Sequence, residues 1–350
     1  MQGLIINTVL NPIRLVQKNI SLALSFLALS FLAFFLLISP LDASDSPKST
    51  LPLVVISQIV QHASLDQEYA GIIAALKDAG YIDGKTIKII YQNAQGSMAT
   101  AILIASNFAS RKPTVAIAIS TPSAQTLIQP MMDQKMPLVF TAVTDPLEAK
   151  LVTNLRTRLE AVTGVSDALI PGPQLDLIQK LVPSVKNIGI VYNSGEINST
   201  KAVQQLKKEA AKRGLTLVMA MADKSSEIIS ATTKLIGKVD AIYVPNDNTA
   251  VASMESIVTL GKKFKIPVFA GDAGSVERGA LAAQAYERFT LGKVAGALVV
   301  QILQGQKAGD LIVETDHPLV LMINLKSAQE MGVTIPDDMK NQAKIMGEKP

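Results

Sequence analysis

Short apolar runs alternate with amphipathic segments from Leu53 to about the middle of the chain. The runs are rich in Val and Ile and have the length of buried strands, which places predicted strands at residues 54–60, 86–91, 114–119 and 138–142. The segments between them carry apolar residues three and four positions apart, which predicts helices over residues 65–79, 97–110 and 122–133. This alternation is typical of a parallel α/β sheet.

The same alternation repeats further along the chain. Predicted strands follow at residues 187–192, 216–221, 241–244 and 267–271. Predicted helices lie beside them at residues 172–181, 200–213, 225–235 and 249–264. Because strands joined through helices form parallel sheets covered on both faces, the predicted fold is α/β, with two doubly wound parallel-sheet lobes.

A short apolar run at residues 162–167 marks the expected join between the two sets. We expect an N-terminal lobe at residues 53–165, completed by about residues 287–310. We expect a C-terminal lobe at residues 166–286, with about residues 311–350 crossing back. Two or three segments would then connect the lobes, and such connections form a hinge.

An uncharged apolar run at residues 20–38 precedes the alternating region. Arg14 and Lys18 lie before it, which is the charge pattern of an export signal in a hydrophobic N-terminal helix. Its length of about 19 residues lies between that of a cleaved signal and that of a bilayer span, so cleavage after Ala43 and retention as an anchor both stay open. In either case residues 44–52 form a linker, and the rest of the chain is extracytoplasmic, in the periplasm or at the outer face of the cytoplasmic membrane.

The composition excludes several kinds of site. The chain has no cysteine and two histidines, which excludes disulfides, cysteine-ligated zinc and three-histidine metal sites, and we expect neither a metal nor a cofactor. Its net charge of +4 comes from scattered basic residues, so we expect no nucleic-acid partner. Dinucleotide-binding, nucleophile-elbow and zinc-protease motifs are absent from the sequence. We therefore expect no catalytic residue.

Polar residues follow the predicted strands, at the end of a parallel sheet where ligands bind. Hydroxyl and backbone N–H groups at a helix start suit a carboxylate, and Asp145 or Asp272 suits an ammonium group, so the set matches an amino acid. Each of these residues is also an ordinary helix cap, and this alternative stays open. The candidate ligand-binding residues are His62, Ser120, Thr121, Ser123, Thr144, Asp145, Asn193, Ser194, Asn246, Asp247, Asn248 and Asp272.

Several segments in a fixed order carry a resemblance to a known family. From about residue 53 to residue 335 the chain resembles the substrate-binding proteins of ABC importers, in the group that includes tryptophan- and tyrosine-binding members. The segments are IIYQNAQG (89–96), AIAISTPSAQ (116–125), FTAVTDPLEAKLV (140–152), VTGVSD (162–167), IGIVYNSGEINS (188–199), DAIYVPNDNT (240–249), IPVFAGDAGSVERGALAA (266–283) and INLKSAQEMGVTIP (323–336).

The resemblance implies a function without catalysis. Proteins of this family have two α/β lobes joined by hinge strands, close around one small solute and deliver it to a membrane permease. It implies that the chain binds an amino acid as a monomer, with the aromatic amino acids among the candidates, and that the candidate residues stand where the family's ligand loops fall. The chain departs from similar proteins at Gln61, where they tend to have Glu, and at Arg288, where they tend to have Tyr. Both changes leave the solute open and could favour a more acidic ligand.

Two other functions stay open on the residues alone. A ligand-binding sensor domain, anchored by residues 20–38, would use the same hinge to signal to a partner. An enzyme on the same fold would need a catalytic set that the sequence does not display.

Overall fold

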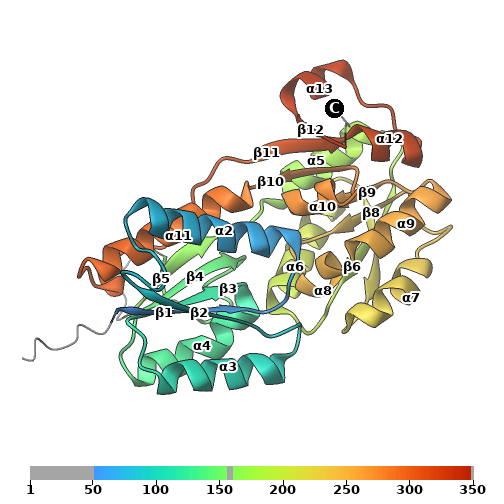
Figure 1. Ribbon diagram of the computed structural model, residues 1–350. Helices are drawn as coiled ribbons and strands as arrows, with labels where there is room; N and C mark the ends of the chain where they lie inside the picture. The colour runs from blue at the N-terminus through green and yellow to red at the C-terminus, as the bar shows by residue number, and fades with distance from the viewer. Residues whose placement is uncertain (1–50, 156–160, 348–350) are drawn as a thin grey trace, which may run out of the picture. The chain divides into compact units, whose positions relative to one another are not determined.

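Five apolar segments in the first half of the described chain pair as one parallel sheet (Figure 1). The computed structural model describes residues 51–155 and 161–347. The strands are β1 (Leu53–Gln58), β2 (Lys88–Asn93), β3 (Val115–Ile119), β4 (Leu138–Val143) and β5 (Val162–Ser166), in the order β2-β1-β3-β4-β5. The helices packed on them are α2 (Ala63–Asp78), α3 (Met98–Ser110), α4 (Thr121–Asp133) and α11 (Arg288–Leu303). We call this body the first lobe.

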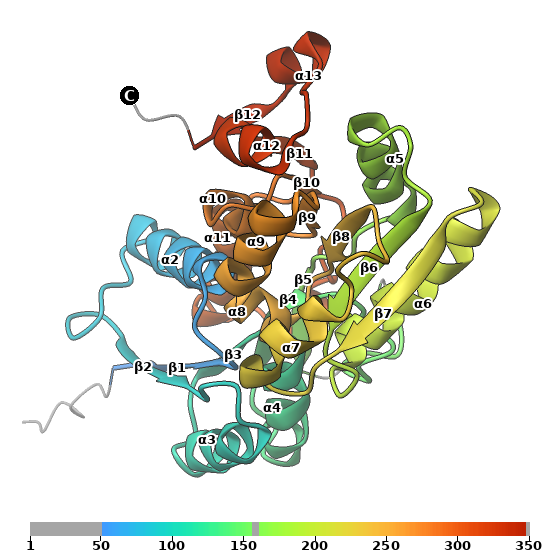
Figure 2. The same ribbon diagram turned by 90° about the vertical axis from the view of Figure 1, so that its right-hand side faces the viewer.

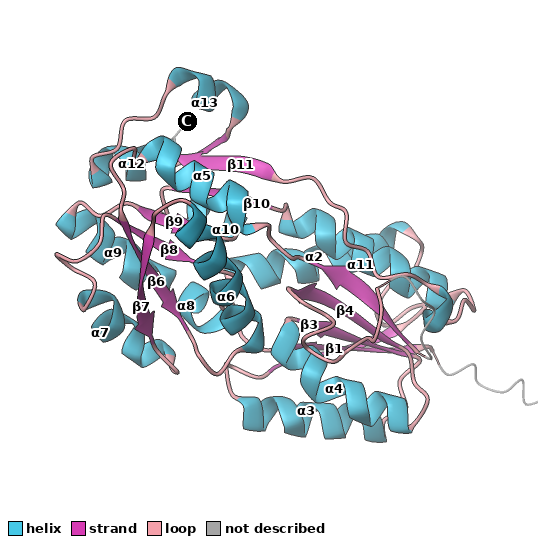
Figure 3. Cartoon of the chain, turned by 180° about the vertical axis from the view of Figure 1, so that it is seen from behind, coloured by secondary structure: helices cyan, strands magenta, loops and turns pink. Residues whose placement is uncertain are grey.

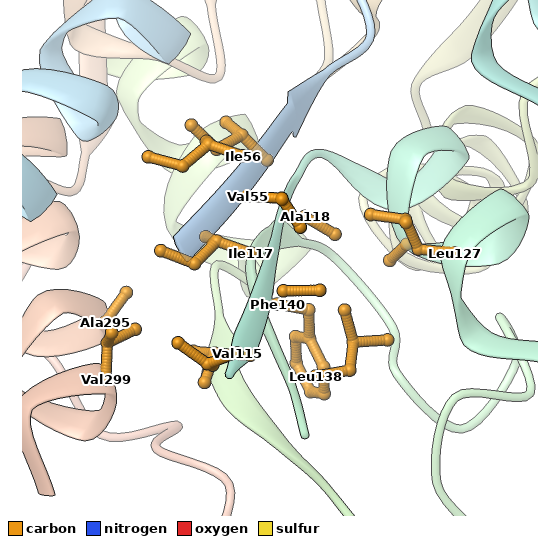
Figure 4. Packing of buried hydrophobic residues seen from close by; sticks show 14 of the residues in the cluster. Val55, Ile56, Val115, Ile117, Ala118, Leu127, Leu138, Phe140, Ala295 and Val299 are labelled. Carbon is orange, nitrogen blue, oxygen red and sulfur yellow. The ribbon is translucent and has the colours of Figure 1, made fainter. Parts of the chain in front are cut away.

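Helices cover both faces of this sheet (Figure 4). The central strand β3 is buried along its whole length, as expected of a strand inside a parallel α/β sheet. Leu127 of α4 lies on one side of the sheet, and Ala295 and Val299 of α11 lie on the other. Since α11 comes from far later in the sequence, the first lobe is completed only when the chain returns to it.

Helices α2 and α11 pack with their backbones in contact. A methyl group at Gly292 would lie 2.1 Å from the carbonyl oxygen of Glu68, and one at Gly71 would lie 2.2 Å from that of Phe289. Both positions therefore require glycine, because no larger residue fits without moving a helix. This close approach places the Glu68 side chain beside Arg288, the first residue of α11.

The later part of the chain forms a second lobe around a seven-stranded sheet (Figure 2). The strands are β6 (Asn187–Tyr192), β7 (Thr216–Met221), β8 (Ala241–Val244), β9 (Val268–Ala270), β10 (Ala282–Ala285), β11 (Val320–Asn324) and β12 (Lys344–Met346). The helices are α5 (Pro171–Leu181), α6 (Ile197–Lys212), α7 (Ile228–Thr233), α8 (Asn248–Ala252), α9 (Met254–Phe264), α10 (Ala273–Glu277), α12 (Leu325–Met331) and α13 (Asp337–Gln342). The order β7-β6-β8-β9-β10 repeats the arrangement of the first sheet, and β11 adds an antiparallel strand beyond it.

Three segments connect the two sheets, which lie apart in Figure 3. The first follows β5, the second leads from β10 into α11, and the third leads from the turn η2 (Ala308–Asp310) to β11. The first and third run side by side, because Ser166 N donates to Glu314 O at 2.8 Å and Glu314 N donates to Gly164 O at 2.9 Å. The predicted fold of two parallel-sheet lobes with hinge connections is thereby confirmed.

Some local expectations need correction. Helix α6 begins at Ile197, three residues before the predicted start at residue 200, and Glu196 is its N-cap. Asn198 and Ser199 lie in its first turn, and their side chains reach the loop after β8. The apolar run at residues 20–38 lies outside the described residues. Within residues 51–155 and 161–347, none of the helices has the length and hydropathy of a bilayer span.

Candidate functional site

A small cavity lies between the lobes, at the carboxyl ends of their parallel strands. Its volume is about 30 Å³, room for one or two water molecules. Eleven of its fourteen lining residues have polar side chains, and the other three are Leu65, Ala142 and Val251. The polar lining residues are His62, Ser64, Ser120, Thr144, Asp167, Asn198, Asn246, Asp247, Asn248, Asp272 and Arg288.

Two buried hydrogen bonds cross the cavity from lobe to lobe. The Oγ of Ser120, directly after β3, donates to Oδ1 of Asn248, directly after β8, at 2.9 Å. The Oγ of Ser64, in the first turn of α2, donates to Oδ1 of Asp272, the N-cap of α10. The two lobes are thus held together through the loops that line the cavity. Gly274 lies at the second contact, where a methyl group would come within 2.5 Å of Ser64 Oγ.

A buried ion cluster forms one side of the cavity. The Nη1 of Arg288 donates to Oδ2 of Asp167 at 2.5 Å and to Oε1 of Glu68 at 2.9 Å. Glu68 also accepts a 2.6 Å hydrogen bond from Thr141 Oγ1, and its side chain is fully buried. Burial raises the pKa of the Glu68 carboxyl, while the positive charge of Arg288 opposes that rise. Asp167 further accepts from Asn246 Nδ2 at 3.1 Å, which extends the cluster into the second lobe.

The loop after β8 is fixed by a second set of carboxylates. Asp247 accepts from Asn193 N at 2.6 Å, from Ser199 Oγ at 2.5 Å and from Ala250 N at 2.7 Å. Burial and the nearby charge of Glu196 raise the pKa of Asp247 to about 7, against the hydrogen bonds that favour its charged form. Glu196 in turn accepts from the backbone of Asn248 at 3.1 Å. The cavity wall on this side is therefore held by many hydrogen bonds before any ligand enters.

His62 is a buried residue of the cavity wall. It is the N-cap of α2, where its Nδ1 accepts from Leu65 N at 3.5 Å. Burial lowers its pKa to about 4, against the attraction of Asp272 and with the help of Arg288. The imidazole is therefore uncharged at neutral pH.

The structure brings together most, but not all, of the residues that the sequence suggested. Seven of them line the cavity: His62, Ser120, Thr144, Asn246, Asp247, Asn248 and Asp272. Thr121 and Ser123 do not line the cavity; they lie buried in the first turn of α4, and their hydroxyls have no hydrogen-bond partner among the described residues. That any of these residues binds a ligand stays a prediction.

Three suggested residues lie elsewhere. Asn193 and Ser194 line a separate groove of about 760 Å³ between the lobes. Asp145 caps its own turn by accepting from Glu148 N at 3.0 Å, and it lies 3.9 Å from Lys201 Nζ of the second lobe. Its carboxylate thus points at the edge of the lobe contact and does not line the cavity.

Four polar lining residues were not among the suggested ones. Asp167 directly follows β5, which ends at Ser166. It was not selected as a residue beyond a strand end because the predicted apolar run at residues 162–167 included it. Ser64 and Asn198 lie in the first turns of α2 and α6, where polar residues carry no distinctive signal. Arg288 stood out only as a departure from similar proteins. Among the described residues, no group of His, Asp and Glu is placed to hold a metal ion.

The charges of the cavity suit a small zwitterion. Asp167 and Asp272 contribute negative charge close to the opposite charge of Arg288. An ammonium group fits beside the carboxylates, and a carboxylate fits beside the guanidinium. Arg288 belongs to the first lobe and Asp272 to the second, so one small molecule can contact both lobes at once.

Comparisons with known proteins agree with this geometry. A family model described as "ABC transporter substrate binding protein" matches residues 53–346. A curated relative from Clostridioides difficile, named "Tyrosine-binding protein", is 43% identical over 269 residues, which is 77% of either chain.

Two solved structures differ in how well they superpose. One is described as an ABC domain in complex with L-Trp from Streptococcus pneumonia; it is 35% identical, covers 85% of this chain and 99% of its own, and has a TM-score of 0.80. The other is the ligand-free, open structure of a substrate-binding protein from Clostridium difficile; it is 36% identical, covers 85% of this chain and 100% of its own, and has a TM-score of 0.64. At nearly equal identity, the structure described here is more similar to the L-Trp complex than to the open form.

Proposed function

The chain belongs to the family of ABC transporter substrate-binding proteins, and from that premise we propose that it binds an amino acid between its two lobes and delivers it to a membrane permease. An aromatic amino acid is the first candidate, because one relative that is 43% identical is named a tyrosine-binding protein and a structure that is 35% identical is a complex with L-Trp. We further propose that it acts outside the cytoplasm and without catalysis.

The observation that carries the proposal is the pair of hydrogen bonds that join the lobes across the cavity, Ser120 to Asn248 and Ser64 to Asp272. Groups that bond to each other across a cleft are also placed to bond to a ligand between them. A ligand that contacts both lobes binds the closed arrangement better than the open one, so it shifts the population toward closure.

The size of the cavity supports an opening step. Pockets that hold drug-sized ligands have volumes of about 300–1,000 Å³, whereas this cavity has about 30 Å³. An aromatic amino acid therefore enters only when the lobes separate about the three connecting segments. The ligand then favours the closed arrangement. Because the surface of the closed, ligand-bound protein differs from that of the open one, a permease can distinguish the two.

Isothermal titration calorimetry of the purified protein tests the proposal. It is first denatured gently to release any bound ligand, which mass spectrometry identifies, and then refolded and titrated with L-tyrosine, L-tryptophan, L-phenylalanine and L-glutamate. We expect saturable one-to-one binding of at least one of them. A folded protein that binds none of these amino acids and releases none would contradict the proposal.

A further inference from the structure

Arg288 has a hydrogen-bonding edge that the protein leaves unused. Both of its hydrogen bonds leave from Nη1, to Glu68 and Asp167. Its Nε is buried and has no acceptor among the described residues, and no hydrogen bond to them leaves from Nη2. The residue is only 3% exposed and lines the cavity between the lobes.

The unused atoms form one side of a planar group. In a guanidinium, the N–H bonds of Nε and Nη2 point the same way and match the two oxygens of a carboxylate. A buried N–H group without an acceptor is costly, so such an edge is rare unless something else binds it. Here the edge belongs to a residue in the wall of a cavity.

Its neighbours hold the guanidinium in place. Glu68 is fixed by the hydrogen bond from Thr141 Oγ1, and it lies on α2, which packs directly against α11 through Gly292. Asp167 is held by Thr144 Oγ1 at 3.2 Å as well as by Asn246. With Nη1 shared between two fixed carboxylates, the plane of the guanidinium cannot turn freely. The edge is therefore pre-oriented, which lowers the entropy lost on binding.

We propose that the Nε and Nη2 edge of Arg288 binds a carboxylate of the ligand and makes Arg288 a specificity-determining residue of this site. The inference rests on the proposed function. The carboxylate has two possible sources, the α-carboxylate of any amino acid or the side chain of an acidic one. The carboxylate of Asp272, which lines the cavity from the second lobe, remains for the ammonium group.

The test pairs each ligand with an analogue that lacks one carboxylate. Tyramine is tyrosine without its α-carboxylate, and glutamine is glutamate with its side-chain carboxylate replaced. Calorimetry of both ligands with the parent protein and with Arg288→Lys gives a thermodynamic cycle for each pair. Lysine is chosen because it keeps the positive charge but cannot donate two parallel hydrogen bonds to one carboxylate. Arg213→Lys is the matched control, since Arg213 pairs with Asp176 and Glu209 on the surface and does not line the cavity.

We expect Arg288→Lys to weaken binding of the carboxylate-bearing member of one pair by about tenfold or more, and of its analogue by clearly less. The tyrosine pair would identify the α-carboxylate, and the glutamate pair would identify a side-chain carboxylate. Equal weakening within both pairs, or none in either, would overturn the inference. Because an unpaired Glu68 can unfold an Arg288 variant, the double variant Glu68→Gln and Arg288→Gln, which removes both charges, is measured in the same way after its thermal unfolding has been recorded.

A separate probe distinguishes failure of this inference from failure of the proposed function. Formate is the smallest carboxylate and needs no amino-acid site. We expect it to raise the melting temperature of the parent more than that of Arg288→Lys. A parent that binds no amino acid but shows this difference would refute the proposed function and keep the Arg288 edge. A parent that binds an amino acid, but whose binding of carboxylates is unchanged in Arg288→Lys, would refute the inference about Arg288 and support the proposed function.

Discussion

Ser120 Oγ lies 2.9 Å from Asn248 Oδ1, and this hydrogen bond joins the loop after β3 in the first lobe to the loop after β8 in the second. Ser120 reaches this position with a φ of 88° and a ψ of 152°, a backbone conformation that glycine adopts and other residues rarely do. Such strain costs about 1–3 kcal/mol and is typical of residues at binding sites. The Ser120 hydroxyl is therefore held in position at a cost in backbone free energy.

Two substitutions at Ser120 separate the effect of its hydroxyl on ligand binding from the effect of its backbone strain on stability. Ser120→Ala and Ser120→Gly both remove the contact with Asn248, so we expect each to weaken ligand binding by about 1 kcal/mol. Glycine also relieves the backbone, so Ser120→Gly should unfold at a higher temperature than Ser120→Ala. Calorimetry and thermal unfolding measure the two effects. A glycine variant less stable than the alanine variant would show that the backbone is unstrained.

Close packing of α2 against α11 gives a prediction about stability. A methyl group at Gly292 would come within 2.1 Å of the Glu68 carbonyl oxygen, so Gly292→Ala must push the helices apart. We expect it to lower the free energy of unfolding by about 1–3 kcal/mol. Gly172→Ala is the control, because the nearest atom to its methyl group is the end of the flexible Arg213 side chain at 3.3 Å. Urea unfolding of both variants checks this, and equal losses would contradict it.

Stability should depend on pH through His62. Its pKa is about 4 in the folded protein, mainly because of burial, and about 6.5 in the unfolded chain. Between these values the unfolded state binds the proton and the folded state does not, so stability is lost as the pH falls from about 6.5 to 4. Asp272, Arg288 and Arg278 are the charged groups that act on it.

A His62→Gln variant isolates this effect. Asp247 contributes the opposite slope, since its folded pKa of about 7 lies above its unfolded value and its stabilisation is lost as the pH rises from about 4 to 7. Urea midpoints of the parent and the variant between pH 4 and 7 should therefore differ mainly at the acid end, where the variant loses less stability. Parallel curves for the two proteins would contradict the lowered pKa of His62.

Asp272 and Asp145 should differ in their effect on ligand binding. Asp272 lines the cavity, and Asp145 lies at the edge of the lobe contact near Lys201. Replacing Asp272 by Asn removes a buried charge from the ligand's ammonium group, which should weaken binding by about 2 kcal/mol or more. Replacing Asp145 by Asn removes only a partly exposed ion pair, worth about 1 kcal/mol or less. Calorimetry with the ligand that binds the parent compares them, and equal losses would remove Asp272 from the ammonium site.

The sequence was sufficient for the inner strands of the sheets, because these are buried on both faces and therefore appear as continuous apolar runs, such as residues 115–119. The rule that ligands bind beyond strand ends also found Asn248 and Asp272. It could not exclude Asp145, because the direction of a side chain in a loop depends on the turn that follows it. In this case Asp145 caps that turn.

The ion cluster lay beyond the reach of the sequence for a different reason. Glu68 and Arg288 are 220 positions apart, and they meet only because α11 returns to the first lobe and packs on α2. The one local sign was that Glu68 follows Leu65 by three positions and precedes Ile72 by four, so a carboxylate occupies the apolar stripe of α2. A charge at such a position indicates a buried partner, but it does not identify that partner.

Closure of two lobes on a ligand is the central claim, and small-angle X-ray scattering of the purified protein tests it most directly. Profiles are recorded without ligand and with a saturating amount of the amino acid that binds in calorimetry. We predict that the radius of gyration falls on addition of the ligand, and that Gly274→Val, whose side chain would collide with Ser64 at the lobe contact, reduces this change. A radius of gyration that is the same with and without the bound amino acid would contradict the account.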